Sequence, residues 1–324
     1  MPSNWIFWVL FNLFVLAMLA LDLGVFHRTK HVIKFREAIG WTIVWVSLAG
    51  IFALFLFFFG HTLVGHLGRS NSELTLEFIT GYVIEESLSV DNLFVFLLIF
   101  RYFQVPKHYQ HSVLFWGVIG ALIMRAVFIL AGVQLLNRFE WIIYLFGAIL
   151  IYSGFKLLLQ RDQKIEPEKN IVLRAFRKLF PVTKTYEDDK FFVLRDGIRY
   201  ATPLAIVLIV IETTDLLFAV DSIPAVLAVT REPFIVYTSN VFAILGLRSL
   251  YFALAGMMET FHLLHYGLSL ILMFIGVKMI VSHYWKIPIG VALGVVAGVL
   301  LLSIAGSLLF PRKLRGGIEE REGI

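Results

Sequence analysis

The chain has 324 residues, of which 59% are hydrophobic and only 16% charged, and its formal net charge is +5. Soluble domains carry about 45–50% apolar and about 25% charged residues. This composition, with a mean hydropathy of +0.83, therefore excludes a soluble enzyme and a disordered chain and indicates a polytopic membrane protein. The lack of cysteine excludes thiol redox chemistry, thiolate metal sites and disulfides. The basic residues cluster beside apolar segments, which favours membrane orientation over nucleic-acid binding.

Nine apolar segments are long enough to cross a bilayer, because about 20 apolar residues suffice for a transmembrane helix. In chain order they are Trp5–Val25, Trp41–Phe59, Leu74–Phe100, His111–Val133, Phe139–Gln160, Arg199–Val229, Phe234–Gly256, Phe261–Val281 and Pro288–Phe310. Isolated strands would leave backbone polar groups unsatisfied in lipid. The first segment lacks a basic leader and a small-residue cleavage site, which favours a retained span over a signal peptide. The sequence therefore predicts an all-α membrane protein with about nine transmembrane helices.

The basic residues of the loops are distributed unevenly. With loops assigned alternately to the two sides, one side holds 20 of the 28 Lys and Arg and the other holds four, while four more lie within spans. Cytoplasmic loops carry the excess of positive charge. We therefore expect the N-terminus outside and the C-terminus in the cytoplasm.

The loop between the fifth and sixth spans is the only sizeable predicted soluble segment. Within it, Ile171–Val182 alternates apolar and basic residues, which suits a short helix on the membrane surface. Phe191–Tyr200 is typical of a hairpin that turns at Asp196-Gly197. The alternative for both segments is a solvated connector.

Spans three to five resemble spans six to eight. Phe139, Tyr144, Gly154 and Lys156 recur 122 positions later as Phe261, Tyr266, Gly276 and Lys278; Val90-Asp91-Asn92 recurs as Val220-Asp221-Ser222; and Arg125 and Arg248 are each the fifteenth residue of their span. In the predicted topology, the first group of three spans begins outside the membrane and the second begins inside. The two groups are therefore inverted relative to each other. Inverted repeats are typical of secondary transporters. The alternative is chance similarity between apolar helices.

This repeat predicts five parts of the chain. Residues 1–73 hold two N-terminal helices, 74–160 the first repeat, 161–198 a cytoplasmic loop, 199–283 the second repeat, and 284–324 the last helix and a cytoplasmic tail.

Each triplet begins with a span that carries one carboxylate and another six residues later. The pairs are Glu85 with Asp91 and Asp215 with Asp221. A carboxylate at the bilayer centre costs about 2.5–3.5 kcal/mol even on insertion scales, so acids at matching positions indicate a function. The alternative, a carboxylate near the interface that contacts water, applies chiefly to Glu77 and Glu86.

On a regular helix, residues six apart point roughly 120° away from each other. We therefore expect a local break near Ser89-Val90 and near Ala219-Val220 to let the carboxylates converge. Pro224 supports a break, because it cannot bond to the carbonyl of Val220; the alternative is an ordinary kink. Freed carbonyls together with carboxylates would form an oxygen site for a hard cation.

The charge balance of these spans also favours a cation. Apart from Glu77 near the start of the third span, they hold six acids, namely Glu85, Glu86, Asp91, Glu212, Asp215 and Asp221. Arg125 and Arg248 are the only mid-span bases, and we expect these arginines to pair with the acids when no metal is bound. A divalent ion or protonation would relieve the remaining negative charge. Oxygen ligands without cysteine suit magnesium, calcium or manganese and do not separate the three. The predicted ligands are Glu85, Asp91, Asn92, Glu212, Asp215, Asp221 and Ser222, supported by Arg125, Arg248, Asn240 and Pro224.

Other polar residues near the span ends are weaker candidates. Lys156 and Lys278 are expected to extend toward the interface. The pairs His262/His265 and His108/His111 fit interfacial histidines better than metal ligands, and Asp22 suits an ion contact or an interface residue equally. The chain has no nucleotide-binding loop, zinc-protease helix or intramembrane aspartyl-protease motif, so we expect neither an enzyme nor a tightly bound cofactor.

Three segments resemble signatures of the TerC family, nearest to its Alx-like branch. They are Glu-x-Ser-Leu-Ser-Val-Asp-Asn at Glu85–Asn92, Glu-x-x-Asp-x-x-Phe-Ala-Val-Asp-Ser-Ile-Pro-Ala at Glu212–Ala225, and Thr238–Arg248. Leu21–Gly24 and the region after Pro288 also fit, so the resemblance covers nearly the whole chain. One departure is Glu86, where Lys would be equally expected.

The resemblance implies manganese export across a bacterial inner membrane, with the acidic motif residues as ligands of Mn²⁺. Proton exchange through the same carboxylates is a further hypothesis, and Ca²⁺ or H⁺ are alternative ions. The family name also refers to tellurium resistance, and Alx-like members are described as redox modulators. The rival interpretation is a metal- or pH-sensing membrane scaffold, or a redox component, without net transport. The expected partners are the transported ion and the lipid bilayer, and we expect no nucleic-acid partner. The sequence leaves the direction of transport, the coupling ion and the oligomeric state open.

Overall fold

The computed structural model describes residues 5–26, 35–64, 69–159, 170–195, 197–255, 263–282, 284–285 and 287–309. Its helices are α1 (Trp5–Phe26), α2 (Phe35–Val64), α3 (Asn71–Tyr102), α4 (Lys107–Arg138), α5 (Ile142–Leu159), α6 (Ile171–Leu179), α7 (Pro203–Leu227), α8 (Pro233–Leu254), α9 (Leu264–Val281) and α10 (Ile289–Leu309). Each of the nine predicted spans forms one of these helices, and the shorter α6 lies in the predicted loop.

Seven described helices are long and apolar enough to cross a membrane, namely α2, α4, α5, α7, α8, α9 and α10. The 32-residue α3 differs because it carries acids such as Glu77, Glu85 and Asp91 along its length. The apolar stretch Trp5–Leu21 of α1 is slightly shorter than the seven. The chain is therefore an all-α, multi-pass membrane protein.

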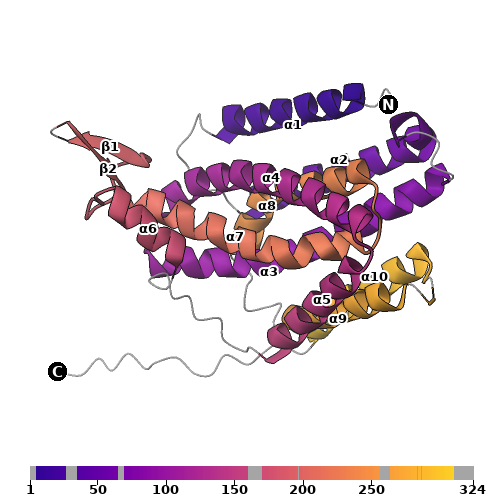
Figure 1. The fold of residues 1–324 in the computed structure, drawn as a ribbon. Coiled ribbons are helices and arrows are strands. Elements are labelled where there is room, and N and C mark those ends of the chain that lie inside the picture. Colours follow the sequence, from indigo (N-terminus) through magenta and orange to yellow (C-terminus); the bar gives the residue numbers. More distant parts are fainter. Residues whose placement is uncertain are drawn as a thin grey trace.

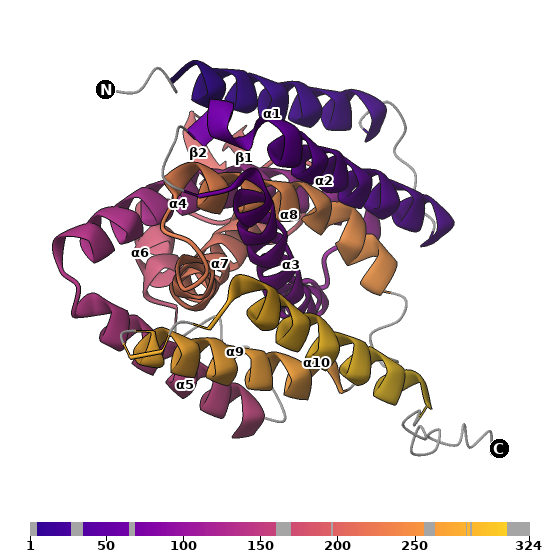
Figure 2. The same ribbon diagram turned by 90° about the vertical axis from the view of Figure 1, so that its right-hand side faces the viewer.

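The helices α3, α4, α7 and α8 form the centre of the bundle (Figures 1 and 2). Helices α1 and α2 cover one side, and α5, α9 and α10 lie on the other. Eighteen of the 22 residues of α8 are buried, whereas α10 buries only Ala292, Val296 and Ser307. Helix α8 is therefore far more enclosed by the rest of the protein than α10.

Helices α5 and α9 pack antiparallel through small residues. A Cβ atom on Gly147 would lie 2.9 Å from the carbonyl oxygen of Gly276, and one on Gly154 would lie 2.8 Å from that of Ser269. In the repeat, Gly147 corresponds to Ser269 and Gly154 corresponds to Gly276, each 122 residues later. The contact of Gly147 with Gly276 is therefore the repeat-related counterpart of the contact of Gly154 with Ser269. In the same way, α3 packs on α8, and their repeat-related counterparts α7 and α4 pack on each other. The packing thus has the two-fold symmetry that the inverted repeat predicts.

The predicted breaks in the acid-bearing spans are wrong. Helix α3 runs unbroken from Asn71 to Tyr102, and α7 runs from Pro203 to Leu227 with Pro224 inside its last turn. Proline removes one backbone donor, and this loss is small so close to the helix end. Elsewhere in lipid each unsatisfied backbone group costs several kcal/mol, which keeps both helices intact.

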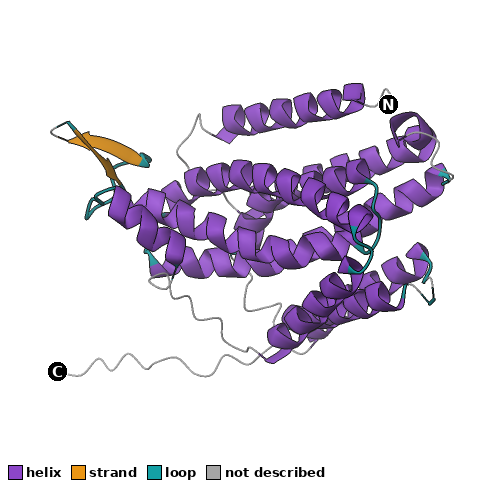
Figure 3. Cartoon of the chain, in the orientation of Figure 1, coloured by secondary structure: helices purple, strands orange, loops and turns teal. Residues whose placement is uncertain are grey.

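The loop before α7 contains the predicted short helix and hairpin (Figure 3). Asn170 caps α6, since its side-chain oxygen accepts from the Leu173 N–H at 3.1 Å, and its Nδ2 donates to Thr213 Oγ1 of α7 at 2.7 Å. Strands β1 (Phe192–Arg195) and β2 (Ile198–Ala201) pair antiparallel, and Gly197 turns with a φ of 76°. Helix α6 ends at Leu179, before the predicted end, because the chain turns there toward the hairpin.

Candidate functional site

Arg125 of α4 lies at the centre of the bundle and is only 1% exposed. Its Nη1 forms a hydrogen bond and ion pair with Glu85 Oε1 of α3. The same nitrogen donates to Asn240 Oδ1 at 3.1 Å and to Ser222 Oγ at 3.3 Å. Its Nη2 lies 3.5 Å from Asp215 Oδ1 of α7. The expected pairing of Arg125 with intramembrane acids is therefore confirmed.

We call these five side chains the Arg125 cluster. Its four oxygen-bearing members come from α3, α7 and α8, and none is more than 3% exposed. Among the described residues, Glu85 Oε2 and Asp215 Oδ2 have no hydrogen-bond partner. Removing charges from water is costly unless they are paired and hydrogen-bonded. One guanidinium facing two carboxylates therefore leaves oxygen atoms available for a further cation or proton.

The other two carboxylates, Asp91 and Asp221, line a separate cavity of about 150 Å³. Its polar lining consists of Asp91, Asn92, Tyr152, Ser153, Lys156, Asp221 and Ser222. Asp221 Oδ1 accepts a hydrogen bond from Ser153 Oγ of α5 at 2.6 Å, and Asp91 Oδ1 lies 3.9 Å from His265 Nδ1 of α9. We call this the Asp91–Asp221 cavity.

The cavity and the Arg125 cluster are adjacent. Ser222 lines the cavity and also accepts from Arg125, so it stands between the two groups. Asn92 also lines the cavity, and its Nδ2 is buried without a hydrogen-bond partner in the described part of the chain. The predicted single site is thus two neighbouring groups of polar residues.

The remaining predicted site residues lie around these two groups. Glu212 is half-buried on α7, and its carboxylate contacts α4 so closely at Gly120 that a Cβ atom there would clash with Oε1. Arg248 is 4% exposed within α8, and its pairing with the acids stays a prediction. Pro224 is buried in the last turn of α7.

No three His, Asp or Glu side chains within the described ranges lie close enough together to hold a metal ion. Unbroken helices explain this result, because they keep the members of each six-residue pair on different faces. Arg125 holds Glu85 and Asp215 instead. Binding a cation between these two acids would require the guanidinium to move.

Sequence patterns missed several polar contacts. The contact of Ser153 with Asp221 was not predicted, because Ser153 lies in an otherwise apolar span. Its position directly before Gly154, which the repeat matches, was the available signal. Lys278 was expected to reach the interface, and this is wrong: it is 7% exposed, and its Nζ donates to the Ala228 carbonyl at 3.2 Å. Glu77, for which contact with water was one interpretation, is 4% exposed and pairs with Arg69 at 3.0 Å. His262 and the Asp22 side chain lie outside what the structure describes.

Comparison with known proteins places the chain in a family. The model of the integral membrane protein TerC family matches residues 70–315. A protein of Myxococcus xanthus described only as a membrane protein is 50% identical over 305 residues, covering 94% of this chain and 92% of its own length.

Two further relatives carry the name Alx, with a description that suggests a membrane-bound redox modulator. The one from Salmonella typhi is 45% identical over 300 residues, with 92% of each chain covered. The one from Escherichia coli K12 is 45% identical over 298 residues, covering 91% of this chain and 92% of its own. No solved structure matches the chain. By the extent of the family match and these identities, the chain belongs to the TerC family of integral membrane proteins.

Proposed function

We propose that this protein is a divalent-cation transporter that exports Mn²⁺ from the cytoplasm across a bacterial inner membrane. The observation that carries the proposal is the Arg125 cluster. Two buried carboxylates from symmetry-related helices, an amide oxygen and a hydroxyl oxygen surround one cationic group. Carboxylate, amide and hydroxyl oxygens are the ligands that hard divalent cations prefer.

Arg125 acts in this proposal as a resident counterion. While no metal is bound, its guanidinium partly neutralises Glu85 and Asp215 and keeps both side chains in place. An entering Mn²⁺ carries two positive charges and can balance both carboxylates, which the single guanidinium charge cannot. Displacement of Arg125 by the ion then couples occupancy of the site to movement of α4.

The Asp91–Asp221 cavity serves as the entrance. Its residues Tyr152, Ser153 and Lys156 lie in the last two turns of α5, the end that leads into the loop before α6. The excess of basic residues assigns that loop to the cytoplasm. Two carboxylates near the mouth would attract a cation from that side, which agrees with export.

Release on the other side follows alternating access, in which one repeat moves against the other around a fixed site. Once Mn²⁺ has left, two carboxylates face one guanidinium, and a proton can balance the surplus negative charge during the return step. We therefore include Mn²⁺/H⁺ exchange in the proposal.

The decisive experiment measures Mn²⁺ uptake into inside-out vesicles. We expect uptake by the unaltered protein and loss of uptake in Asp91→Asn and in Asp215→Asn. Asp189→Asn, in the exposed segment before the hairpin, is the matched control and should transport normally. Competition by Ca²⁺ and Mg²⁺ tests the choice of ion. Absence of uptake by folded protein at every imposed pH gradient would refute transport.

The second candidate is a metal- or pH-sensing scaffold without net transport, and the ordered segment of α6 and the hairpin favours it. This segment is anchored to α7 through Asn170 and projects from the end of the bundle (Figure 1), where a soluble partner could bind. Metal binding without flux would support this candidate. A redox component, as the description of the relatives suggests, would show haem or flavin absorbance in the purified protein.

A further inference from the structure

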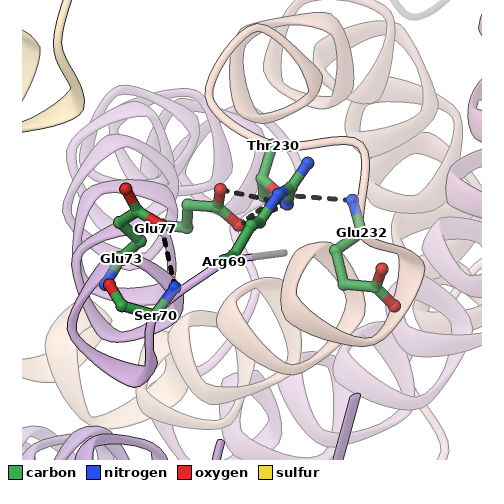
Figure 4. A network of polar contacts seen from close by, with 6 residues as sticks. All are labelled: Arg69, Ser70, Glu73, Glu77, Thr230 and Glu232. Carbon is green, nitrogen blue, oxygen red and sulfur yellow. Dashed lines mark hydrogen bonds and ion pairs between the residues drawn. The ribbon is translucent and has the colours of Figure 1, made fainter. Parts of the chain in front are cut away.

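A second network of charged residues lies at the end of the bundle where α3 begins (Figure 4). Arg69 Nη1 donates to both carboxylate oxygens of Glu77 at 3.0 Å and to Thr230 Oγ1 at 3.3 Å. Thr230 Oγ1 donates to Glu77 Oε2 at 2.6 Å and accepts from the backbone N–H of Glu232 at 3.2 Å. These contacts tie the start of α3 to the connection between α7 and α8.

The network is joined to two helices that also contribute to the Arg125 cluster, because Glu77 lies in α3 and Thr230 lies in the connection after α7. Glu77 is eight residues before Glu85 in α3, which is about 12 Å along a helix. Thr230 is eight residues after Ser222 in the chain. The network therefore joins α3 to the α7 side a second time, nearer the end of the bundle.

A tightly packed layer separates the two networks. A Cβ atom on Gly81 of α3 would lie 2.9 Å from Ser239 Oγ of α8 and 3.2 Å from a methyl carbon of Val226 of α7. Three helices thus meet without room for an ion. In addition, Lys278 of α9 bonds to the carbonyl of Ala228 in the same α7–α8 connection. This end is closed, whereas the cavity residues Asp91 and Ser153 lie in the halves of α3 and α5 that are farther from it.

We propose that Arg69, Glu77 and Thr230 form a latch that holds this end of the bundle shut and opens to release the ion on the side opposite the cavity. Alternating access requires one end to be closed while the other is open. Glu77 and Thr230 are each 4% exposed, but the Arg69 side chain is 36% exposed. Water can therefore take over the arginine's hydrogen bonds, which makes the contact reversible. The latch rests on the proposed function only for the identity of what passes through it.

The latch can be tested by cysteine labelling, because the chain has no cysteine of its own. Ser239→Cys places one thiol in the packed layer, where Ser239 is 0% exposed. A membrane-impermeant maleimide is added from the latch side, without Mn²⁺. We expect Glu77→Gln and Thr230→Val to raise the labelling rate about tenfold, because each removes charge-assisted hydrogen bonds of the latch. Glu140→Gln, exposed at the same end between α4 and α5, should leave the rate unchanged.

Two outcomes would overturn the latch. One is an unchanged labelling rate in both variants while they remain folded by circular dichroism and gel filtration. The other is an equal increase in Glu140→Gln. If Ser239→Cys does not fold, Val226→Cys reports on the same layer. Because labelling needs no transport, faster labelling together with absent Mn²⁺ flux would refute the proposed function and retain the latch.

Discussion

The Arg125 cluster and the Asp91–Asp221 cavity each contain one carboxylate from each repeat, yet the surroundings of the two groups are opposite. In the cluster Glu85 is 0% and Asp215 3% exposed, and a guanidinium joins them. In the cavity Asp91 and Asp221 are half-buried around about 150 Å³ of space. The spacing of six residues on unbroken helices causes the difference, because it turns the second acid of each pair away from the first.

This difference suits the two groups to different steps in binding a cation. The cluster holds its oxygen atoms in place with an internal positive charge, so it is suited to selecting an ion that can displace the arginine. The cavity keeps its acids accessible, so it is suited to attracting ions. Predictions at Arg125, Gly276 and Ser153 test this division, beginning with the largest expected effect on stability, and Glu232 provides a reference outside both groups.

Replacing the arginine of the cluster should have the largest effect. Arg125→Met leaves Glu85 and Asp215 buried without a partner charge, and we expect a loss of about 3–5 kcal/mol in the free energy of unfolding. Denaturant titration in detergent micelles measures it. Arg101→Met, at the exposed end of α3, is the control and should change stability little.

Mn²⁺ added to the same variant sharpens the test. If the guanidinium occupies the place of the cation, Mn²⁺ should stabilise Arg125→Met more than the unaltered protein, because no resident charge competes. Equal shifts of the thermal midpoint in both proteins would contradict the role of Arg125 as a resident counterion.

Gly276→Ala should disturb the wall of the cavity and spare the cluster. The new Cβ atom would lie 2.7 Å from the carbonyl oxygen of Gly147, so α5 and α9 must separate. Overpacking of this kind costs about 1–3 kcal/mol. Gly294→Ala in α10, with no atom within 4 Å of its Cβ position, is the matched control. Comparable destabilisation in both variants would show that the close contact between Gly276 and Gly147 does not cause the loss of stability.

Ser153→Ala should act mainly on the cavity. It removes the hydrogen bond that Asp221 accepts at 2.6 Å, for which we expect a loss of about 1 kcal/mol. The apparent affinity of Mn²⁺ uptake should weaken more than the maximal rate, because the carboxylate loses its positioning contact. Ser282→Ala removes a bond to the Met279 carbonyl of its own helix and should leave uptake unaltered. A change in maximal rate alone would argue against the cavity as the entrance.

A carboxylate outside both groups provides a reference with the smallest effect. Burial raises the pKa of Glu232, while the nearby Arg69 opposes the shift. A raised carboxyl pKa means that folding favours the protonated form, so stability falls as pH rises through it. The thermal midpoint of Glu232→Gln should therefore equal that of the unaltered protein at pH 4 and exceed it slightly at pH 8. A larger advantage at pH 4 would reverse the sign and contradict the prediction.

Much of the fold was predictable because it depends on local properties of the chain. Apolar length predicted nine segments that all form helices, of which seven in the described part of the chain are long and apolar enough to cross a membrane. The Asp196-Gly197 turn predicted the hairpin. The pairing of Arg125 with acids was also predictable, since a charge within lipid needs a partner. The breaks near Ser89 and Ala219 were not, because intact backbone hydrogen bonds in lipid outweigh any benefit of bringing the acids together.

The sequence by itself determined the class of protein, the positions of its long apolar segments, the inverted repeat and the presence of intramembrane acids, because composition, periodicity and spacing express these directly. Only the tertiary structure decided which acids meet. Contacts such as Ser153 with Asp221 and Arg69 with Thr230 join helices far apart in the chain, and they depend on how each helix is rotated against its neighbours. No pattern within one helix encodes that rotation, so the division between the Arg125 cluster and the Asp91–Asp221 cavity appears only after the helices have packed.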